Sequence, residues 1–336
     1  MKKSILLLLI LVNSNLLLLS QDIHFSQFFE APLLRNPSLS GIFKGDIRVQ
    51  AVYRDQWNSV TNAFRTGSLN GEYKMPIGGA NDFITAGLQI LYDRAGTIGW
   101  TSTHILPAIN YHKSLSNEHN RYLSLGFMGG IVQRRFDPSK MTTNSQFDGL
   151  GVGETFDQTS YTYADGSAGI SYNADLNNNP DNNFYLGVAY HHFNRPKFSF
   201  YRNSNIELNP KWVFSGGMRF GVTEYAYVTL QADHSRQGSF NETVAGGMYG
   251  FKLGGDPDKP DYTIHTGAFI RWNDAIIPVL KLDYSPFSVA ISYDVNISKL
   301  KPSTHGRGGF ELSISYVGFS SKLDKSSLNS TLCPRF

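Results

Sequence analysis

Two short clusters in the sequence combine residue types that could do chemistry. His191 and His192 are adjacent, and a pair of imidazoles could ligate one metal ion. Asp233 and His234 precede Ser235, and these are the residue types of a nucleophilic hydrolase. The histidines lie in a predicted strand, where neighbouring side chains point to opposite faces, and a triad needs groups that converge in space. We therefore expect neither a metal site nor a catalytic triad, and interpret the histidines as rim or lumen residues.

A third cluster resembles the start of a calcium loop. Asp175, Asn177, Asn179 and Asp181 alternate, but Pro180 occupies the position that needs glycine, and Leu186 replaces the bidentate glutamate. A polar turn explains this segment better. The sequence also contains no Walker motif, dinucleotide fingerprint or nucleophile elbow. We expect a protein that is not an enzyme and has no cofactor.

The elements that would hold any site are strands, because apolar and polar residues alternate with period two. Between Phe287 and Val295, for example, the odd positions are large and apolar, while the even ones are Ser, Ala and Asp. Such segments recur fourteen times. The expected strands span 46–56, 63–74, 82–93, 100–112, 120–133, 162–173, 183–193, 209–220, 224–234, 240–252, 261–272, 274–283, 286–296 and 307–318.

Composition favours a barrel that crosses a membrane. Only 17% of the 336 residues are charged, against roughly 25% in soluble domains, while 13% are aromatic and 32 residues are glycine. The net charge of +3 gives no basic footprint for nucleic acid, and the mean hydropathy of −0.26 excludes a helical membrane protein. The second face of each strand is small and polar, which is typical of a hydrated lumen. We predict an all-β fold, a transmembrane antiparallel barrel of about 14 strands with periplasmic termini, in the outer membrane.

The chain start indicates export. Lys2 and Lys3 precede an apolar run that ends near Ser20, as in a secretory signal peptide; a single membrane anchor is the alternative. The expected organisation is a signal peptide at 1–20, a periplasmic N-terminal segment at 21–45, a barrel at 46–319 and a tail at 320–336. Cys333 is the only cysteine, so no intramolecular disulfide is expected.

Two regions are candidates for binding a partner. The segment 21–45 could plug the lumen, dock on a periplasmic protein, or form an ordered cap on the lower rim. The long connection 134–161, expected to be extracellular, could bind a protein or fold into its own barrel mouth. The candidate contact residues are His24, Phe25, Phe28, Phe136, Phe147, Phe156 and Tyr161.

The tryptophans test the topology. Trp57 and Trp272 end odd-numbered strands, while Trp100 and Trp212 begin even-numbered ones. All four would then lie at the extracellular rim, where we expect them to form an outer interface belt against lipid.

Short motifs, in order along the chain, resemble the PorP/SprF family of outer-membrane proteins, from the type IX secretion system of Bacteroidetes. The features that match are His24-Phe25-Ser26-Gln27-Phe28, Asn36-Pro37, Gly41, Tyr53-Arg54 with Gln56-Trp57, Leu88-Gln89, Tyr92-Asp93 with Ala95-Gly96, His192 with Asn194 and Pro196, Tyr293-Asp294, Ser298-Lys299-Leu300, Ser303-Thr304-His305-Gly306, Phe310 to Tyr316 and Cys333-Pro334-Arg335-Phe336. Arg35 departs from the family pattern, where small or apolar residues are commoner.

The resemblance implies a partner of the secretion machinery. Its members bind, export or anchor secreted surface proteins, often adhesins of gliding bacteria with a type B C-terminal domain; others associate with the periplasmic ring or with peptidoglycan-binding proteins. The alternative is an outer-membrane porin or transporter for small solutes. A porin should have a charged constriction, and the expected lumen faces are mostly Gly, Ser, Thr and Tyr, which argues against it. An outer-membrane hydrolase would need a Ser/His/acid set that we could not assemble.

Overall fold

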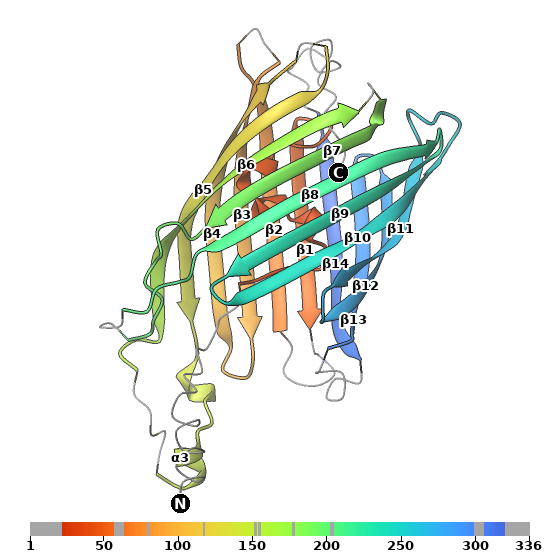
Figure 1. Ribbon diagram of the computed structural model, residues 1–336. Coiled ribbons are helices and arrows are strands. Elements are labelled where there is room, and N and C mark those ends of the chain that lie inside the picture. Colours follow the sequence, from red (N-terminus) through yellow and green to blue (C-terminus); the bar gives the residue numbers. More distant parts are fainter. Residues whose placement is uncertain are drawn as a thin grey trace, which may run out of the picture.

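The computed structural model describes residues 22–56, 64–78, 81–116, 118–150, 153, 156–176, 179–201, 205–298 and 306–319. Within them the chain forms fourteen strands that close into one antiparallel barrel (Figure 1). The strands are β1 (Ile47–Gln56), β2 (Phe64–Pro76), β3 (Phe83–Ala95), β4 (Trp100–Ser114), β5 (Arg121–Arg135), β6 (Ser160–Leu176), β7 (Asn179–His191), β8 (Lys211–Thr223), β9 (Ala226–Gln237), β10 (Phe240–Leu253), β11 (Tyr262–Arg271), β12 (Ala275–Tyr284), β13 (Phe287–Asn296) and β14 (Arg307–Gly318).

Each strand pairs with its neighbours in sequence, and β1 pairs with β14 to close the barrel. In that last pairing Ile47 lies opposite Gly318 and Gln56 lies opposite Gly309. The prediction of an antiparallel barrel of about fourteen strands is confirmed, with strand ends that differ by a few residues. The signal peptide 1–20, Trp57, Cys333 and the tail 320–336 lie outside the described residues.

The barrel has two ends, which we call the terminal rim and the loop rim. The terminal rim is where β1 begins and β14 ends; the loop rim is where β1 ends. The longest described connection, between β5 and β6, leaves the loop rim and carries η3 (Pro138–Lys140) and α3 (Asn144–Phe147). It extends below the barrel in Figure 1.

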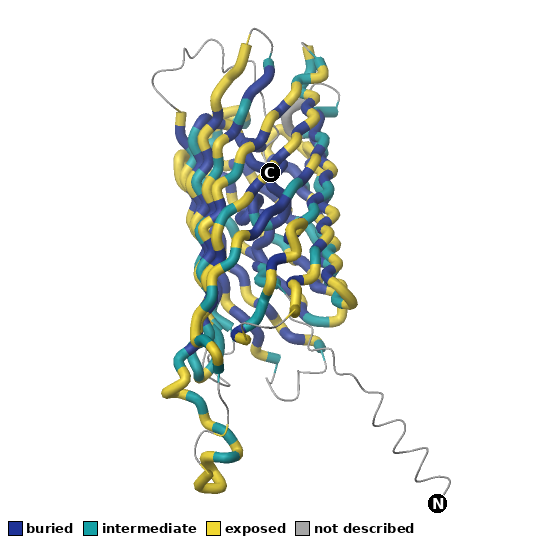
Figure 2. The backbone as a smooth tube through the Cα atoms, turned by 90° about the vertical axis from the view of Figure 1, so that its left-hand side faces the viewer, coloured by how far each residue is buried: buried dark blue, intermediate teal, exposed yellow. Residues whose placement is uncertain are grey.

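Burial alternates along the strands as the period-two pattern predicts (Figure 2). In β13, Phe287, Val289, Ile291, Tyr293 and Val295 are exposed on the outer face, whereas the residues between them point inward. Large apolar side chains on the outside suit contact with lipid hydrocarbon. No helix of the described residues is long and apolar enough to cross a bilayer.

The N-terminal segment lies inside the barrel. It contains η1 (Phe28–Glu30), α2 (Pro32–Arg35) and η2 (Pro37–Leu39), drawn in red within the strands of Figure 1. From Phe25 to Phe43 every residue is buried except Leu34, which is half-buried. We call residues 22–46 the internal segment.

Candidate functional site

The internal segment runs from the loop rim to the terminal rim. At one end the Asp22 carboxylate lies 3.5 Å from Lys211 Nζ, where β8 begins. At the other end the Asp46 backbone N–H donates to the Gly318 carbonyl, at the end of β14. The segment therefore occupies the lumen along its axis, and its contacts are the main candidate for a functional arrangement.

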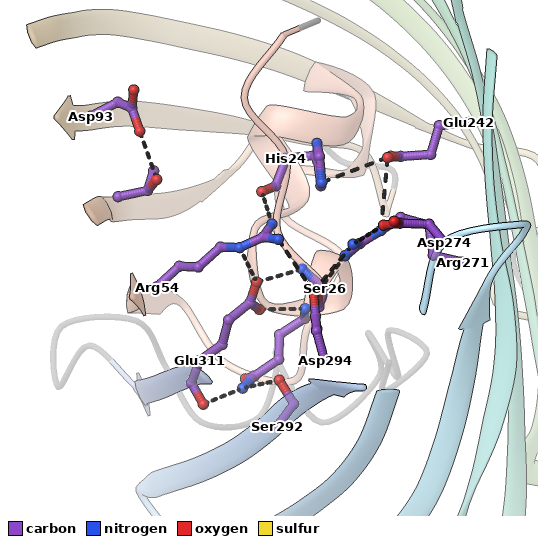
Figure 3. Close-up of polar contacts among 12 residues, drawn as sticks. His24, Ser26, Arg54, Asp93, Glu242, Arg271, Asp274, Ser292, Asp294 and Glu311 are labelled. Carbon is purple, nitrogen blue, oxygen red and sulfur yellow. Dashed lines mark hydrogen bonds and ion pairs between the residues drawn. The ribbon is translucent and has the colours of Figure 1, made fainter. Parts of the chain in front are cut away.

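Glu311, on β14, holds the first turn of this segment (Figure 3). Its two carboxylate oxygens accept hydrogen bonds from the backbone N–H groups of Ser26 and Gln27, each at 2.7 Å. The Gln27 side chain also donates to the Glu311 carbonyl and to Ser292 Oγ, both at 3.1 Å. Buried backbone donors without a local partner are thus satisfied by the barrel wall.

Two arginines complete this network, which Figure 3 shows between β1, β11 and β13. Arg54 donates to the His24 carbonyl at 2.8 Å and lies 3.2 Å from the carboxylate of Asp294. Arg271 lies 3.1 Å from the same carboxylate and donates to the Ser26 hydroxyl, which in turn donates to Asp294 at 2.6 Å. Ser26 therefore lies among groups of opposite charge, namely Arg271 and the carboxylates of Asp294 and Glu311.

His24 lies at the edge of the network. Its Nε2 is 3.6 Å from a carboxylate oxygen of Glu242, on β10. Burial and the positive charges of Arg271 and Arg54 hold the pKa of His24 well below its ordinary value. His24 is therefore neutral at pH 7.

Further along, the internal segment contributes one charge of each sign to the lumen. Arg35 forms a bidentate pair with Asp233 on β9 and donates to the Tyr185 hydroxyl at 2.7 Å. Glu30 lies 2.6 Å from Lys281 Nζ, on β12. Apolar packing accompanies these pairs, because Phe28 and Phe29 contact the inward ring of Phe269 and Leu33 packs on β4 and β5.

Near the terminal rim the segment makes close contact with glycines in the wall. The Asn36 side chain accepts from the Ser38 N–H at 2.9 Å and so caps η2. A Cβ placed on Gly169 would lie 1.9 Å from Asn36 Oδ1, and one on Gly126 would lie 2.5 Å from the backbone of Pro37. These two wall positions need glycine because the turn of η2 approaches them so closely.

Glu72, on β2, secures the next residues. Its carboxylate accepts from the Gly41 N–H at 2.7 Å and from the Ser40 hydroxyl at 3.1 Å, and pairs with Arg48 at 2.8 Å. Lys74 donates to the Phe43 carbonyl. Wall side chains thus hold the segment from its first turn to its last.

At its start, the internal segment contacts His192, which carries a positive charge. His192 Nδ1 lies 2.8 Å from Asp165, and Nε2 lies 3.3 Å from Asp22. Burial opposes the positive charge, but the hydrogen bonds to both carboxylates outweigh it and raise the pKa of His192 to about 9. Burial likewise opposes ionisation of Asp22, yet Lys211 and His192 hold its pKa well below the ordinary value.

Two expectations about the wall are wrong. The lumen is not mostly small and neutral, because inward arginines, lysines and carboxylates form many of its contacts. His191 and His192 do not point to opposite faces; both are buried, with ring centroids 6.3 Å apart. The strand ends at His191, and His192 adopts a φ of 57°, which turns its ring back toward the lumen.

The residues considered for catalysis do not converge. Asp233 is paired with Arg35 inside the barrel, whereas His234 is on the outer face and bonds Thr243 at 2.8 Å. Asp175 accepts from Asn120 at 2.7 Å, and side chains 177–181 lie outside the description. In the part of the chain that is described, no group of three or more His, Cys, Asp or Glu is arranged to hold a metal.

The sequence candidates in the internal segment are turned inward. Phe25 and Phe28 are 3% and 6% exposed, so a partner outside the barrel does not reach them in this conformation. Their rings fill the space between the segment and the wall.

The aromatic candidates of the β5–β6 connection divide into two groups. Phe136, Phe156 and Tyr161 pack with Trp100 and Phe200 into what we call the rim cluster, with centroids 4.7–5.0 Å apart in its closest pairs. Phe136 is buried within this cluster. Away from the barrel, Phe147 is 93% exposed and Leu150 is 78% exposed. The rim cluster therefore supports the connection, and α3 presents its free surface.

The described tryptophans lie at the loop rim. Trp100 begins β4 and is half-buried in the rim cluster. Trp212 near the start of β8 and Trp272 just after β11 are exposed, and Trp212 lies 4.5 Å from Tyr190 between ring centroids. A belt against lipid stays a prediction.

Comparison with known proteins identifies the family. The chain matches the family described as type IX secretion system membrane protein PorP/SprF over residues 18–316. It belongs to the PorP/SprF family. The family and the barrel together place the chain in the outer membrane as a component of type IX secretion, and this membership confirms the resemblance found in the sequence.

Solved structures share the barrel. The toluene transporter TbuX of Ralstonia pickettii is 8% identical, with 85% of this chain and 92% of that chain covered and a TM-score of 0.51. The toluene transporter TodX of Pseudomonas putida is 12% identical, with 85% and 92% covered and a TM-score of 0.48. CdiB from Acinetobacter baumannii is 9% identical, with 81% and 60% covered and a TM-score of 0.45. At such identities the likeness shows the fold alone, and no curated protein matches the chain.

Several PorP/SprF-like motifs meet in space. Ser26 and Gln27 come from the first motif, Arg54 from the motif in β1, and Asp294 and Glu311 from the C-terminal motifs. In the barrel they form one hydrogen-bonded network. The alternation in the sequence predicts that Asp294 and Glu311 face inward. It gives no signal that they contact the start of the internal segment, because only barrel closure brings the two ends of the chain together.

Proposed function

We propose that this PorP/SprF-family chain is a non-enzymatic docking component of type IX secretion. In this role it binds, exports or anchors a secreted, adhesin-like surface protein with a type B C-terminal domain, and it contributes to gliding where the cell glides. The observation that carries the proposal is the internal segment, whose buried residues occupy the lumen and are tied to the wall by Glu311, Asp233 and Glu72. A lumen filled in this way suits a protein platform better than a diffusion pore.

The orientation follows from the same proposal. The terminal rim would face the periplasm, where other type IX components such as the periplasmic ring or a peptidoglycan-binding protein are available. The loop rim would face outward. There, Phe147 at the end of α3 and Leu150 just after it are exposed apolar side chains, of the kind that anchors protein contacts.

Affinity purification from outer membranes in mild detergent tests the proposal. The wild-type chain should co-purify a large surface protein in stoichiometric amount. The double variant Phe147→Ser/Leu150→Ser should lose it, whereas Leu115→Ser, at an exposed leucine of the terminal-rim turn, should retain it. Recovery of periplasmic ring components alone would instead indicate a structural part of the machinery.

The porin alternative is tested with the same preparation in planar bilayers. A diffusion porin should conduct ions steadily, and a closed docking barrel should not. A purified barrel that conducts and brings no protein partner would overturn the docking proposal and favour transport of small solutes.

A further inference from the structure

A cavity of about 410 Å³ lies between the internal segment and the wall. Phe29, Glu30 and Phe43 line its inner side; Arg219 and Tyr227, near the β8–β9 turn, line its outer side. Much of its remaining lining, such as Lys259, Pro286 and Phe319, comes from turns and strand ends at the terminal rim, so the cavity opens toward that rim. Its volume falls within the range of about 300–1,000 Å³ that is usual for small-ligand sites.

Most buried charges in the cavity are already neutralised by neighbours. Arg48 pairs with Glu72 at 2.8 Å, and Lys281 pairs with Glu30 at 2.6 Å. Asp283 lies 2.8 Å from His265 and 3.7 Å from Lys281. The positive and negative charges of these groups therefore nearly cancel.

Arg219 differs from these groups because no acidic side chain of the described residues pairs with it. Its side chain points inward from β8, and the residue is only 5% exposed. The guanidinium carbon lies 4.4 Å from the centroid of the Tyr227 ring, and Nε is buried without a hydrogen-bond partner. Among the described residues no carboxylate forms an ion pair with Arg219. A buried cation without a counter-charge is costly, and a ring face compensates only part of that cost.

We propose that this cavity is a binding site for a carboxylate-bearing ligand that enters from the terminal rim and pairs with Arg219. A guanidinium matches a carboxylate in shape and charge and can hold it through two parallel hydrogen bonds. Tyr227 and Phe29 offer apolar surface to the remainder of the ligand, as expected for an acidic peptide segment.

The mouth of the cavity carries exposed charges of both signs. Lys259 in the β10–β11 turn and Lys44 before β1 line it and are exposed, and Asp256, Asp258 and Asp261 of the same turn are exposed as well. Selectivity for an anion would therefore come from Arg219 inside the cavity. This inference does not depend on the proposed role in cargo docking.

Calorimetric titration of the full mature chain in nonionic detergent provides the test, with N-acetyl-diglutamate as the probe. We expect binding that weakens as salt increases, and no binding of the neutral N-acetyl-diglutamine amide. Arg219→Gln should weaken binding at least tenfold. Arg236→Gln, at an exposed arginine of β9 near the loop rim, is the matched control and should bind like the wild type.

A second variant, Lys259→Glu, and a second anion, inorganic phosphate, provide further tests. Lys259→Glu changes only an exposed turn residue, so the barrel should fold, and binding should weaken several-fold. The proposal would be overturned if Arg219→Gln and Lys259→Glu bound the diglutamate probe as tightly as the wild type, or if the wild type did not bind it. Binding of inorganic phosphate that diglutamate does not displace would overturn the assignment to a carboxylate.

Discussion

Arg35 and Asp233 form a bidentate ion pair inside the barrel, with Nε and Nη2 of the arginine 2.6 and 2.5 Å from the two carboxylate oxygens. The side chains are 8% and 12% exposed, and 198 residues separate them in sequence. The pair joins α2 of the internal segment to β9. It also involves the position at which this chain departs from the family pattern, so the family resemblance did not imply it.

Arg35→Leu should loosen the internal segment while the barrel remains folded. Removing one partner of a buried pair leaves the other charge uncompensated, which typically costs about 3–5 kcal/mol. Hydrogen exchange of residues 25–43 should therefore rise strongly. The double variant Arg35→Leu/Asp233→Leu should regain much of the protection. If its loss of protection instead equals the sum of the losses in the two single variants, the two residues are not directly coupled.

Glu311→Ala should release the first turn of the segment. The substitution removes the acceptor of the Ser26 and Gln27 N–H groups, and hydrogen bonds to a charged group each contribute roughly 1.5–3 kcal/mol. Exchange of these two amides should accelerate at least tenfold by mass spectrometry. Glu118→Ala, at an exposed residue in the β4–β5 connection, serves as the control and should leave their exchange unchanged.

The strands could be predicted from the sequence because alternation is a local property. Each strand of this barrel has one lipid-facing side and one inward side, so residues such as Val289 and Asp294 reveal their faces without knowledge of any neighbour. The path of the internal segment could not be predicted in this way. Phe25 and Phe28 looked like docking residues because exposed and buried aromatics are identical in sequence.

The charges of the lumen were missed for a related reason. Arg54 and Glu311 are inward residues on β1 and β14, and these strands become neighbours only when the barrel closes. Similarly, His192 could be placed only after the end of β7 and its positive φ were known. Long-range pairing of this kind leaves no periodic signal in a single sequence.

Gly169→Ala should disturb η2 through steric overlap alone. The added methyl group would overlap Asn36, whose side chain caps η2, and overpacking of this kind typically costs about 1–3 kcal/mol. We expect increased exchange at residues 36–41, with an unchanged heat-modifiable band of the barrel in gel electrophoresis. Gly71→Ala is the matched control, because nothing lies within 4 Å of its added Cβ. If both variants exchange alike, the close contact with Asn36 has no energetic consequence.

The contact between His192 and Asp22 should depend on pH. The pKa of His192 is about 9 in the folded chain and about 6.5 when a histidine is free, which corresponds to roughly 3 kcal/mol. Because the folded value is the higher one, this stabilisation is fully present below pH 6.5 and is lost as the pH rises through 9. In a nuclear magnetic resonance titration of the labelled histidines, one ring should titrate with a midpoint near 9. Asp165→Asn should lower that midpoint, since one of the two carboxylates is removed, and His192→Gln should abolish the signal. A His192 midpoint near 6.5 in the wild-type chain would show that the start of the internal segment is not held by this ion pair.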